Sequence, residues 1–145
     1  MIEQIEPWED KVWGSTRRCV LSPVYSLHEL ILNSGGYCSL HYHMNRANRF
    51  TVISGFVRIV WCYGWEVHEV CLEQKQWFMI KSQVPHQFQV LVEGKMLEEY
   101  VSDQDGVQLN DIVRLSIGGK VDAEFLRGNP KSIILEDGTV WKGGI

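Results

Sequence analysis

LHYHMNRANRFTVISG (residues 40–55) joins two histidines, one residue apart, to a run of β-prone side chains that ends in Ser-Gly. Residues two apart in a strand share a face, so His41 and His43 point the same way. Two imidazoles on one face beside a turn can occupy neighbouring positions on one metal ion. An HxH pair also fits a polar strand surface, so the rest of the chain has to decide between the two interpretations.

Short β-prone runs alternate with turn residues along almost the whole chain, and helical periodicity is nearly absent. Gly64 and Gly94 are each predicted to turn a hairpin, between residues 56–63 and 65–72 and between residues 86–92 and 95–101. Roughly ten short strands at this spacing predict an all-β sandwich, jelly roll or barrel.

Three further local predictions follow from turn and helix signals. Ser54-Gly55 is read as a break between strands, and Asp137-Gly138 as the turn of a C-terminal hairpin. The one helix expected is short, around residues 109–113, LNDIV.

The composition excludes several classes of protein. A chain of 145 residues suits one domain, and its net charge of −4 disfavours nucleic-acid binding, which needs a basic face. No apolar run approaches the ~20 residues that span a bilayer, so no membrane association is expected. The acidic, aromatic start does not resemble a signal peptide, and the four scattered cysteines read as reduced thiols. The expected location is the cytoplasm.

A third histidine, His86, follows Pro85 at the start of a later strand. The order Gly35-Gly36, His41-x-His43, Asn48, Gly55 resembles the first cupin motif, G-x5-H-x-H-x3,4-E-x6-G. Residues 77–90, WFMIKSQVPHQFQV, resemble the second motif, in which a turn precedes a metal-binding histidine. The resemblance implies a single-domain cupin over residues 1–145, a double-stranded β-helix or jelly-roll barrel. Its core would cover about residues 12–118, followed by the C-terminal hairpin at 121–145.

Three segments narrow the resemblance: PWEDKVWGS (7–15), SLHYHMNRANRFTVISG (39–55) and MLEEYV…LNDIVRLSIGGK (96–120). Together they are similar to the type II mannose-6-phosphate isomerase domain, also found fused behind mannose-1-phosphate guanylyltransferase. That family implies a metal-dependent sugar-phosphate isomerase in carbohydrate metabolism. The sequence departs from the family's pattern at His41, where the family has Gln, and at Asn48, where it has the Glu ligand. The Tyr-Gly-Arg ending is replaced by Ile-Gly-Gly at 117–119, so a divergent relative with altered chemistry is expected.

The expected metal ligands are His41, His43 and His86, with Asn48 as a possible fourth contact. Three neutral imidazoles and an amide leave a divalent ion its full charge, which favours an anionic oxygen as the next ligand. Nitrogen ligands suit Zn, Fe, Ni or Cu better than Mg or Ca, and Mn is also retained as a candidate. The sequence does not choose among these transition metals.

Three other residues are candidates for catalysis. Arg46 and Arg114 match arginines of the isomerase pattern and could clamp a phosphate or carboxylate, or could be a loop cation and a salt-bridge partner. Glu98 matches an acidic residue, and either Glu98 or Tyr100 could serve as the acid or base of a proton shuttle. Glu98 could equally be the solvent-facing half of a strand.

The leading hypothesis is a divergent sugar-phosphate isomerase-like enzyme acting on an anionic or phosphorylated sugar. One alternative is a three-histidine iron-dependent dioxygenase, and another is a non-catalytic sugar or nucleotide-sugar binding cupin. A homodimer is expected, because pairing would protect an open β edge.

Overall fold

The computed structural model describes residues 5–102 and 111–144, and almost all of its regular structure is β-strand. The strands are β1 (Glu9–Lys11), β2 (Gly14–Ser22), β3 (Tyr25–Leu32), β4 (Gly36–Tyr37), β5 (His41–His43), β6 (Ala47–Tyr63), β7 (Glu66–Leu72), β8 (Trp77–Ile80), β9 (His86–Val101), β10 (Ile112–Arg114), β11 (Gly119–Lys120), β12 (Ile133–Ile134) and β13 (Val140–Trp141). The helices in the described residues are α1 (Ala123–Arg127) and a 3-10 turn, η1 (Glu136–Gly138).

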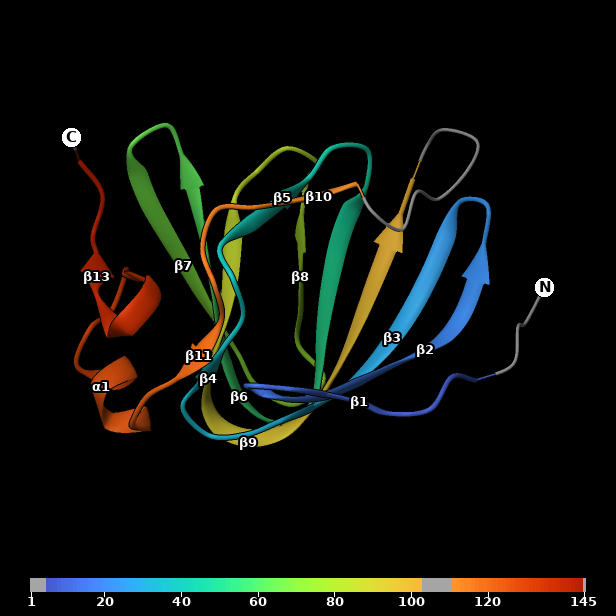
Figure 1. Ribbon diagram of the computed structural model, residues 1–145, viewed down its shortest axis with the longest axis horizontal. Coiled ribbons are helices and arrows are strands. Elements are labelled where there is room, and N and C mark those ends of the chain that lie inside the picture. Colours follow the sequence, from blue (N-terminus) through green and yellow to red (C-terminus); the bar gives the residue numbers. More distant parts are fainter. Residues whose placement is uncertain (1–4, 103–110, 145) are drawn as a thin grey trace.

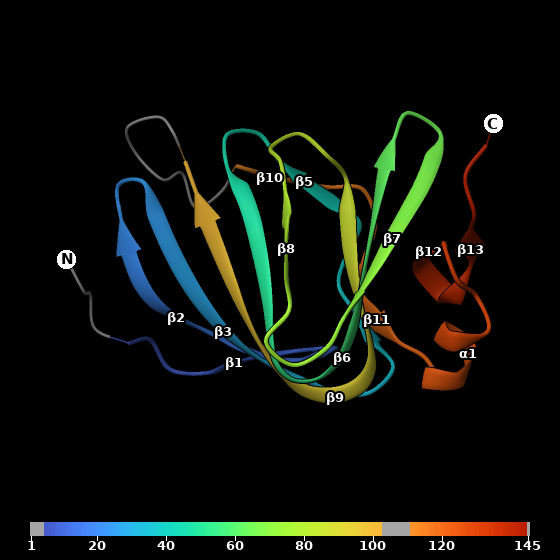
Figure 2. The same cartoon turned by 180° about the vertical axis from the view of Figure 1, so that it is seen from behind.

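Strands β1 to β11 form one antiparallel sheet, and β12 pairs with β13 in a separate ribbon. Strand β9 organises the sheet, because it pairs with β3, β4, β5 and β6 along its length. Figures 1 and 2 show the sheet curling at the bends of β6 and β9, so that its two halves face each other. The predicted all-β jelly-roll fold is therefore confirmed.

The two bends correct two predictions from the sequence. Ser54-Gly55 does not separate two strands, and Gly94 does not turn a hairpin, because both lie inside the continuous strands β6 and β9. A Cβ atom on Gly94 would lie 2.0 Å from the Ser54 carbonyl oxygen, and Gly55 has a φ of 91°. The register shifts between Val52 and Val57. These glycines therefore let two strands approach closely where the sheet curls.

The predicted hairpin around Gly64 is confirmed, since β6 and β7 pair as far as Tyr63 and Glu66. The main core lies between the two halves of the curled sheet and is formed by their inward-pointing side chains. Phe50, Val52 and Met96 have no exposed surface there. Burial of each such side chain stabilises the fold by roughly 1.5–3 kcal/mol.

The C-terminal segment differs in part from its prediction. Helix α1 was not predicted; the Asp122 side chain caps it by accepting a hydrogen bond from the Glu124 amide at 3.1 Å. The helix expected around residues 109–113 is wrong for its described part, because Ile112–Arg114 pairs with β5 as strand β10. Residues 109 and 110 lie outside the described residues. Strands β12 and β13 form the expected C-terminal hairpin, with Asp137 and Gly138 in the connection.

Buried glutamines attach this segment to the outer face of β9, directly beside His86. Gln87 donates to the carbonyl oxygen of Ile134 and accepts from its amide, both at 2.9 Å. Gln89 donates to the carbonyl oxygen of Ser132 at 2.7 Å. Both faces of β9 are therefore covered where it begins. No helix in the described residues has the length and apolar character needed to cross a bilayer.

Candidate metal centre

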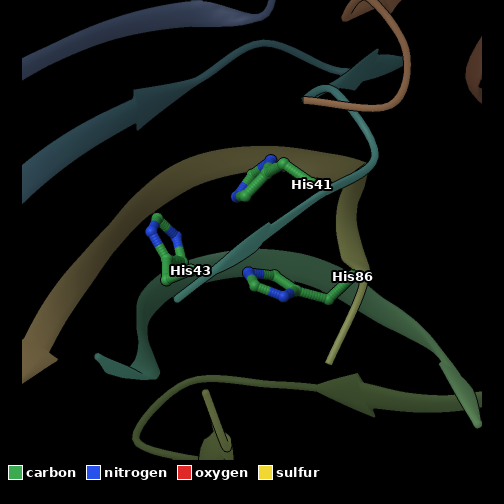
Figure 3. A group of neighbouring side chains, drawn as sticks. All are labelled: His41, His43 and His86. Carbon is green, nitrogen blue, oxygen red and sulfur yellow. The ribbon is translucent and has the colours of Figure 1, made fainter. Parts of the chain in front are cut away.

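Three buried histidines from two strands meet inside the curled sheet. His41 and His43 lie on β5, and His86 begins β9, where it is the register partner of His41. One ligand nitrogen from each residue lies within 4.8 Å of the other two. Figure 3 shows the three imidazoles pointing toward a common space. The structure therefore brings together the three histidines that the sequence selected.

The surroundings of each ring determine which nitrogen is free. The Nδ1 atom faces an oxygen in all three: the Ser39 carbonyl at 2.8 Å from His41, the Asp111 carboxylate at 3.2 Å from His43, and the Val84 carbonyl at 2.8 Å from His86. Each Nδ1 can thus donate its proton outward, which leaves the lone pair on Nε2 directed inward.

Two of these inward nitrogens have no hydrogen-bond partner. The Nε2 atoms of His41 and His43 are buried and unpaired among the described residues. A buried polar atom without a partner is costly, by about 1–3 kcal/mol. A cation held by the three Nε2 atoms would remove that cost, so the residues present fit a metal ion.

Burial also keeps the imidazoles in the form that binds metal. Loss of solvation lowers the pKa of His43 and of His86 to about 4. The pKa of His41 lies well below its ordinary value. Burial is the largest cause, and repulsion from His86 and His43 lowers the pKa further. All three rings are neutral at pH 7, so protons do not compete with the ion.

Asn48 lies where the sequence suggested a fourth contact. Its Oδ1 atom is 3.1 Å from Nε2 of His86. A neutral His86 that donates Nδ1–H to Val84 carries a lone pair on Nε2, so the two atoms facing each other are both acceptors. Two neighbouring ligands at about 2.1 Å from one ion would lie roughly 3–3.5 Å apart, depending on the coordination geometry. The two atoms are therefore close enough to share a cation.

Glu98 and Tyr100 lie on the same inward face of β9, beside Asn48. Glu98 is buried and forms hydrogen bonds with Tyr100 and Asn48. Burial raises the pKa of Glu98 to about 7, although both hydrogen bonds act in the opposite direction. A carboxyl group with this pKa can both take and give a proton near neutrality. Its neighbour Glu99 lies on the outer face, where it accepts from Arg49 at 2.9 Å.

The two candidate arginines have different surroundings. Arg46 is buried, donates to Asp111 through Nε at 2.9 Å and Nη2 at 2.6 Å, and stacks 4.3 Å over the ring of Tyr100. Arg114 is exposed and has no ion pair among the described residues. It is the register partner of His41, whose pKa its charge helps to lower. Arg114 is thus the more available of the two guanidinium groups for an incoming anion.

Part of this site lines one cavity of about 510 Å³. The site residues in its lining are His41, His43, Arg46, Glu98, Tyr100 and Arg114. The volume suits a small-molecule substrate.

Sequence reasoning missed two residues of this site. The sequence did not single out His28, yet it lines the cavity and packs edge-on against Tyr100. Asp111 was not connected with His43, although it lies in one of the three segments that resemble the isomerase family. Only the register of β10 on β5 places the two side chains together. His68 lies elsewhere, stacked on Trp61.

Comparison with known proteins identifies the type of fold. No family model matches the chain, and no curated protein matches it in sequence. Among solved structures, oxalate decarboxylase from Bacillus subtilis matches with a TM-score of 0.66 and 19% identity, over 75% of this chain and 30% of that one. The formate complex of the Lactobacillus farciminis enzyme gives 0.64 and 18%, over 75% and 33%. CapF bound to 3-isopropenyl-tropolone gives 0.65 and 17%, over 77% and 34%.

At this level of identity, the three structures show that the chain shares their fold. The chain spans about a third of the length of the proteins that it matches. Another structure of the B. subtilis decarboxylase concerns its Mn(II) centres. In this chain, the three-histidine cluster by itself fits a divalent metal ion and does not determine which one. The narrower resemblance to mannose-6-phosphate isomerase stays a prediction.

Proposed function

We propose that this chain is a metal-dependent cupin enzyme that transfers protons within a small anionic substrate, with sugar-phosphate isomerisation as the leading reaction. The observation that carries the proposal is the cluster of three neutral imidazoles, two of which line one cavity together with the buried carboxyl group of Glu98. The cupin neighbours support the fold on which it depends. The substrate class, the cytoplasmic location and the homodimer remain expectations.

Glu98 is the residue that we expect to move the proton. In an aldose–ketose isomerisation, a base takes a proton from the carbon beside the carbonyl group and returns it to the former carbonyl carbon. Glu98 suits both steps, because its pKa is about 7. Tyr100 and Asn48 hold the carboxyl group in place through hydrogen bonds. A bound divalent ion would polarise the substrate's carbonyl and hydroxyl oxygens.

Arg114 is the residue that we expect to bind the substrate's phosphate or carboxylate. A guanidinium group presents paired N–H donors to such an anion. Arg46 is less suited, because its Nε and Nη2 atoms already donate to Asp111. We assign Arg46 to the support of the site.

The test begins with metal analysis of protein purified without an affinity tag or chelator. The metal-loaded protein is then assayed for interconversion of mannose 6-phosphate and fructose 6-phosphate, with oxalate as a second substrate. We expect Glu98→Gln to lower kcat at least about 100-fold, and Arg114→Ala mainly to raise KM. Glu99→Gln is the matched control, since the neighbouring carboxylate lies on the opposite face.

Two results would contradict this proposal. Loss of activity in Glu99→Gln equal to that in Glu98→Gln would show that the assay reports general damage to the strand. Binding of sugar phosphates, seen as a shift in melting temperature, with no turnover on any substrate would favour the non-catalytic binding cupin.

A second candidate, the three-histidine iron-dependent dioxygenase, is favoured by one observation. The cluster of converging ligand atoms in the described residues holds three imidazoles and no carboxylate. Such a nitrogen-rich set suits Fe(II). Substrate-dependent oxygen uptake by the Fe(II)-loaded protein would support this candidate, and its absence across a panel of anionic compounds would reject it.

A further inference from the structure

His43 has two neighbours of opposite character at the same ring nitrogen. Its Nδ1 atom lies 3.2 Å from Oδ1 of Asp111, an acceptor, and 3.4 Å from Nη2 of Arg46, a donor. A neutral imidazole carries a single N–H group, so Nδ1 can satisfy one of these neighbours and not both. The identity of the partner decides on which nitrogen the proton lies.

The two outcomes have opposite consequences for metal binding. If Nδ1 donates to Asp111, the lone pair is on Nε2 and points to His41 and His86. If Nδ1 accepts from Arg46, the proton is on Nε2, and that nitrogen cannot bind a cation. Without Asp111, a hydrogen bond from Arg46 to Nδ1 would therefore place the proton on Nε2 of His43 and block metal binding there.

Asp111 is held firmly enough to control this choice. Its side chain is 1% exposed, and Oδ1 accepts from Nε and Nη2 of Arg46 at 2.9 and 2.6 Å. Oδ2 accepts from the amide of Asn45 at 3.1 Å. Its own carbonyl accepts from the Met44 amide, next to His43. The carboxylate thus directs both guanidinium donors toward itself and leaves Nδ1 of His43 to donate.

We propose that Asp111 is a positioning residue that selects the Nδ1–H tautomer of His43 against Arg46, and so presents Nε2 of His43 as a metal ligand. The proposal rests on the metal site of the proposed function. It gives Asp111 and Arg46 a joint role that is distinct from substrate binding.

The tautomer can be measured directly in metal-free protein. Nitrogen-15 NMR of labelled imidazoles distinguishes a protonated ring nitrogen from one with a lone pair. We expect His43 of the wild-type protein to be protonated on Nδ1, and His43 of Asp111→Leu on Nε2. A wild-type His43 protonated on Nε2, or a folded Asp111→Leu protein that keeps Nδ1–H, would overturn the proposal.

Metal affinity supplies the second readout, measured by competition for Zn²⁺ or Co²⁺ with a chromophoric chelator. Loss of such an outer partner of a ligand typically weakens binding about 10- to 100-fold, and we expect this for Asp111→Leu. Asp111→Asn should lose less, because its amide oxygen can still accept from Nδ1. Adding Arg46→Leu to Asp111→Leu should recover part of the affinity, because the competing donor is gone while the outer acceptor is still missing.

Glu69→Ala is the matched control, since it removes a carboxylate that faces another buried arginine, Arg58, at 3.6 Å. It should lower the melting temperature with little change in metal affinity. If the double variant stays as weak as Asp111→Leu while folded, the competition with Arg46 is refuted. If Asp111→Leu does not fold, the proposal is tested by the His43 tautomer of the wild-type protein and by the metal affinity of Asp111→Asn. Wild-type protein that binds metal without turnover would refute the proposed activity and leave this inference standing.

Discussion

Asn48 is the residue at which this site differs most from a metal centre with a carboxylate ligand. Its neutral amide lies 3.1 Å from the inward nitrogen of His86, so an aspartate there would add a negative charge beside the ion. Hard cations gain most from a charged oxygen ligand. We therefore expect Asn48→Asp to strengthen Mn²⁺ binding about tenfold or more, and Zn²⁺ binding by less. Competition titrations of both ions check this.

An unchanged ratio of the two affinities would show that position 48 does not reach the ion. Asn129→Asp is a suitable control. Asn129 carries the same amide at a half-buried position beyond helix α1, where it donates to the Phe125 carbonyl.

Glu98 contributes to the pH dependence of the free energy of unfolding at pH values above the ordinary pKa of a glutamate. Burial raises its pKa from 4.5 to about 7, so between these values the folded protein holds a proton that the unfolded chain releases. The contribution of this group to the free energy of unfolding therefore falls as pH rises through that window. We expect the Glu98 contribution, measured as the stability of metal-free wild-type protein minus that of Glu98→Gln, to fall by about 2–3 kcal/mol between pH 4.5 and 8.

The buried histidines change stability in the opposite sense, because their lowered pKa values make the unfolded chain bind more protons between about pH 4 and 6.5. Both wild type and Glu98→Gln contain these histidines, so their contribution cancels when the free energies of unfolding of the two proteins are subtracted. Urea unfolding of both proteins at several pH values measures the difference. A difference that does not vary with pH would show that Glu98 keeps an ordinary pKa.

Single residues explain why much of the site could be predicted and part of it could not. His41, His43 and His86 could be selected because their spacing and flanking residues resemble the two cupin motifs. Asp111 gains its role only through the pairing of β10 with β5, and Arg46 only through its contact with Asp111. Such partners depend on strand register, which could not be read from residue spacing along the chain.

At the scale of the element, the long strands β6 and β9 show how a glycine signal can mislead. Gly94 and Gly55 were read as ends of strands, because glycine is common in turns. Their function here is to permit close contact between two bent strands. Alternation of apolar residues correctly predicted the strands themselves, whereas it carried no information on whether a glycine ends a strand or bends it.

Gly94→Ala tests this account of the bend. The added Cβ atom would lie 2.0 Å from the Ser54 carbonyl oxygen, which belongs to the paired backbone and cannot move alone. We expect a loss of at least about 3 kcal/mol in the free energy of unfolding, the size of a severe packing error. Gly128→Ala is the control, since its Cβ atom would meet nothing closer than 3.4 Å. Equal stability of the two variants in urea unfolding would contradict the role of Gly94.

At the scale of the whole molecule, the metal site joins parts of the fold that are distant in the chain. His41 and His43 come from β5, His86 begins β9, and the outer face of β9 is covered by the C-terminal segment through Gln87. An ion bound by the three histidines would fix β5 to β9 in the folded state, and the unfolded chain lacks this preformed site. Metal binding should therefore stabilise the entire fold.

The expected size of this stabilisation follows from mass action. At a free metal concentration 100 times Kd, the gain is about 2.7 kcal/mol, which for a chain of this length raises Tm by about 5–10 °C. Calorimetry with added Zn²⁺, Ni²⁺ or Mn²⁺, and after treatment with a chelator, measures the shift. His43→Ala should abolish it, while His68→Ala, which removes an imidazole stacked on Trp61 away from the site, should leave it unchanged. A shift of equal size in wild type, His43→Ala and His68→Ala would place the bound metal elsewhere on the chain. In a site built from His41, His43 and His86, removal of the His43 imidazole must weaken the stabilisation that the metal gives to β5 and β9.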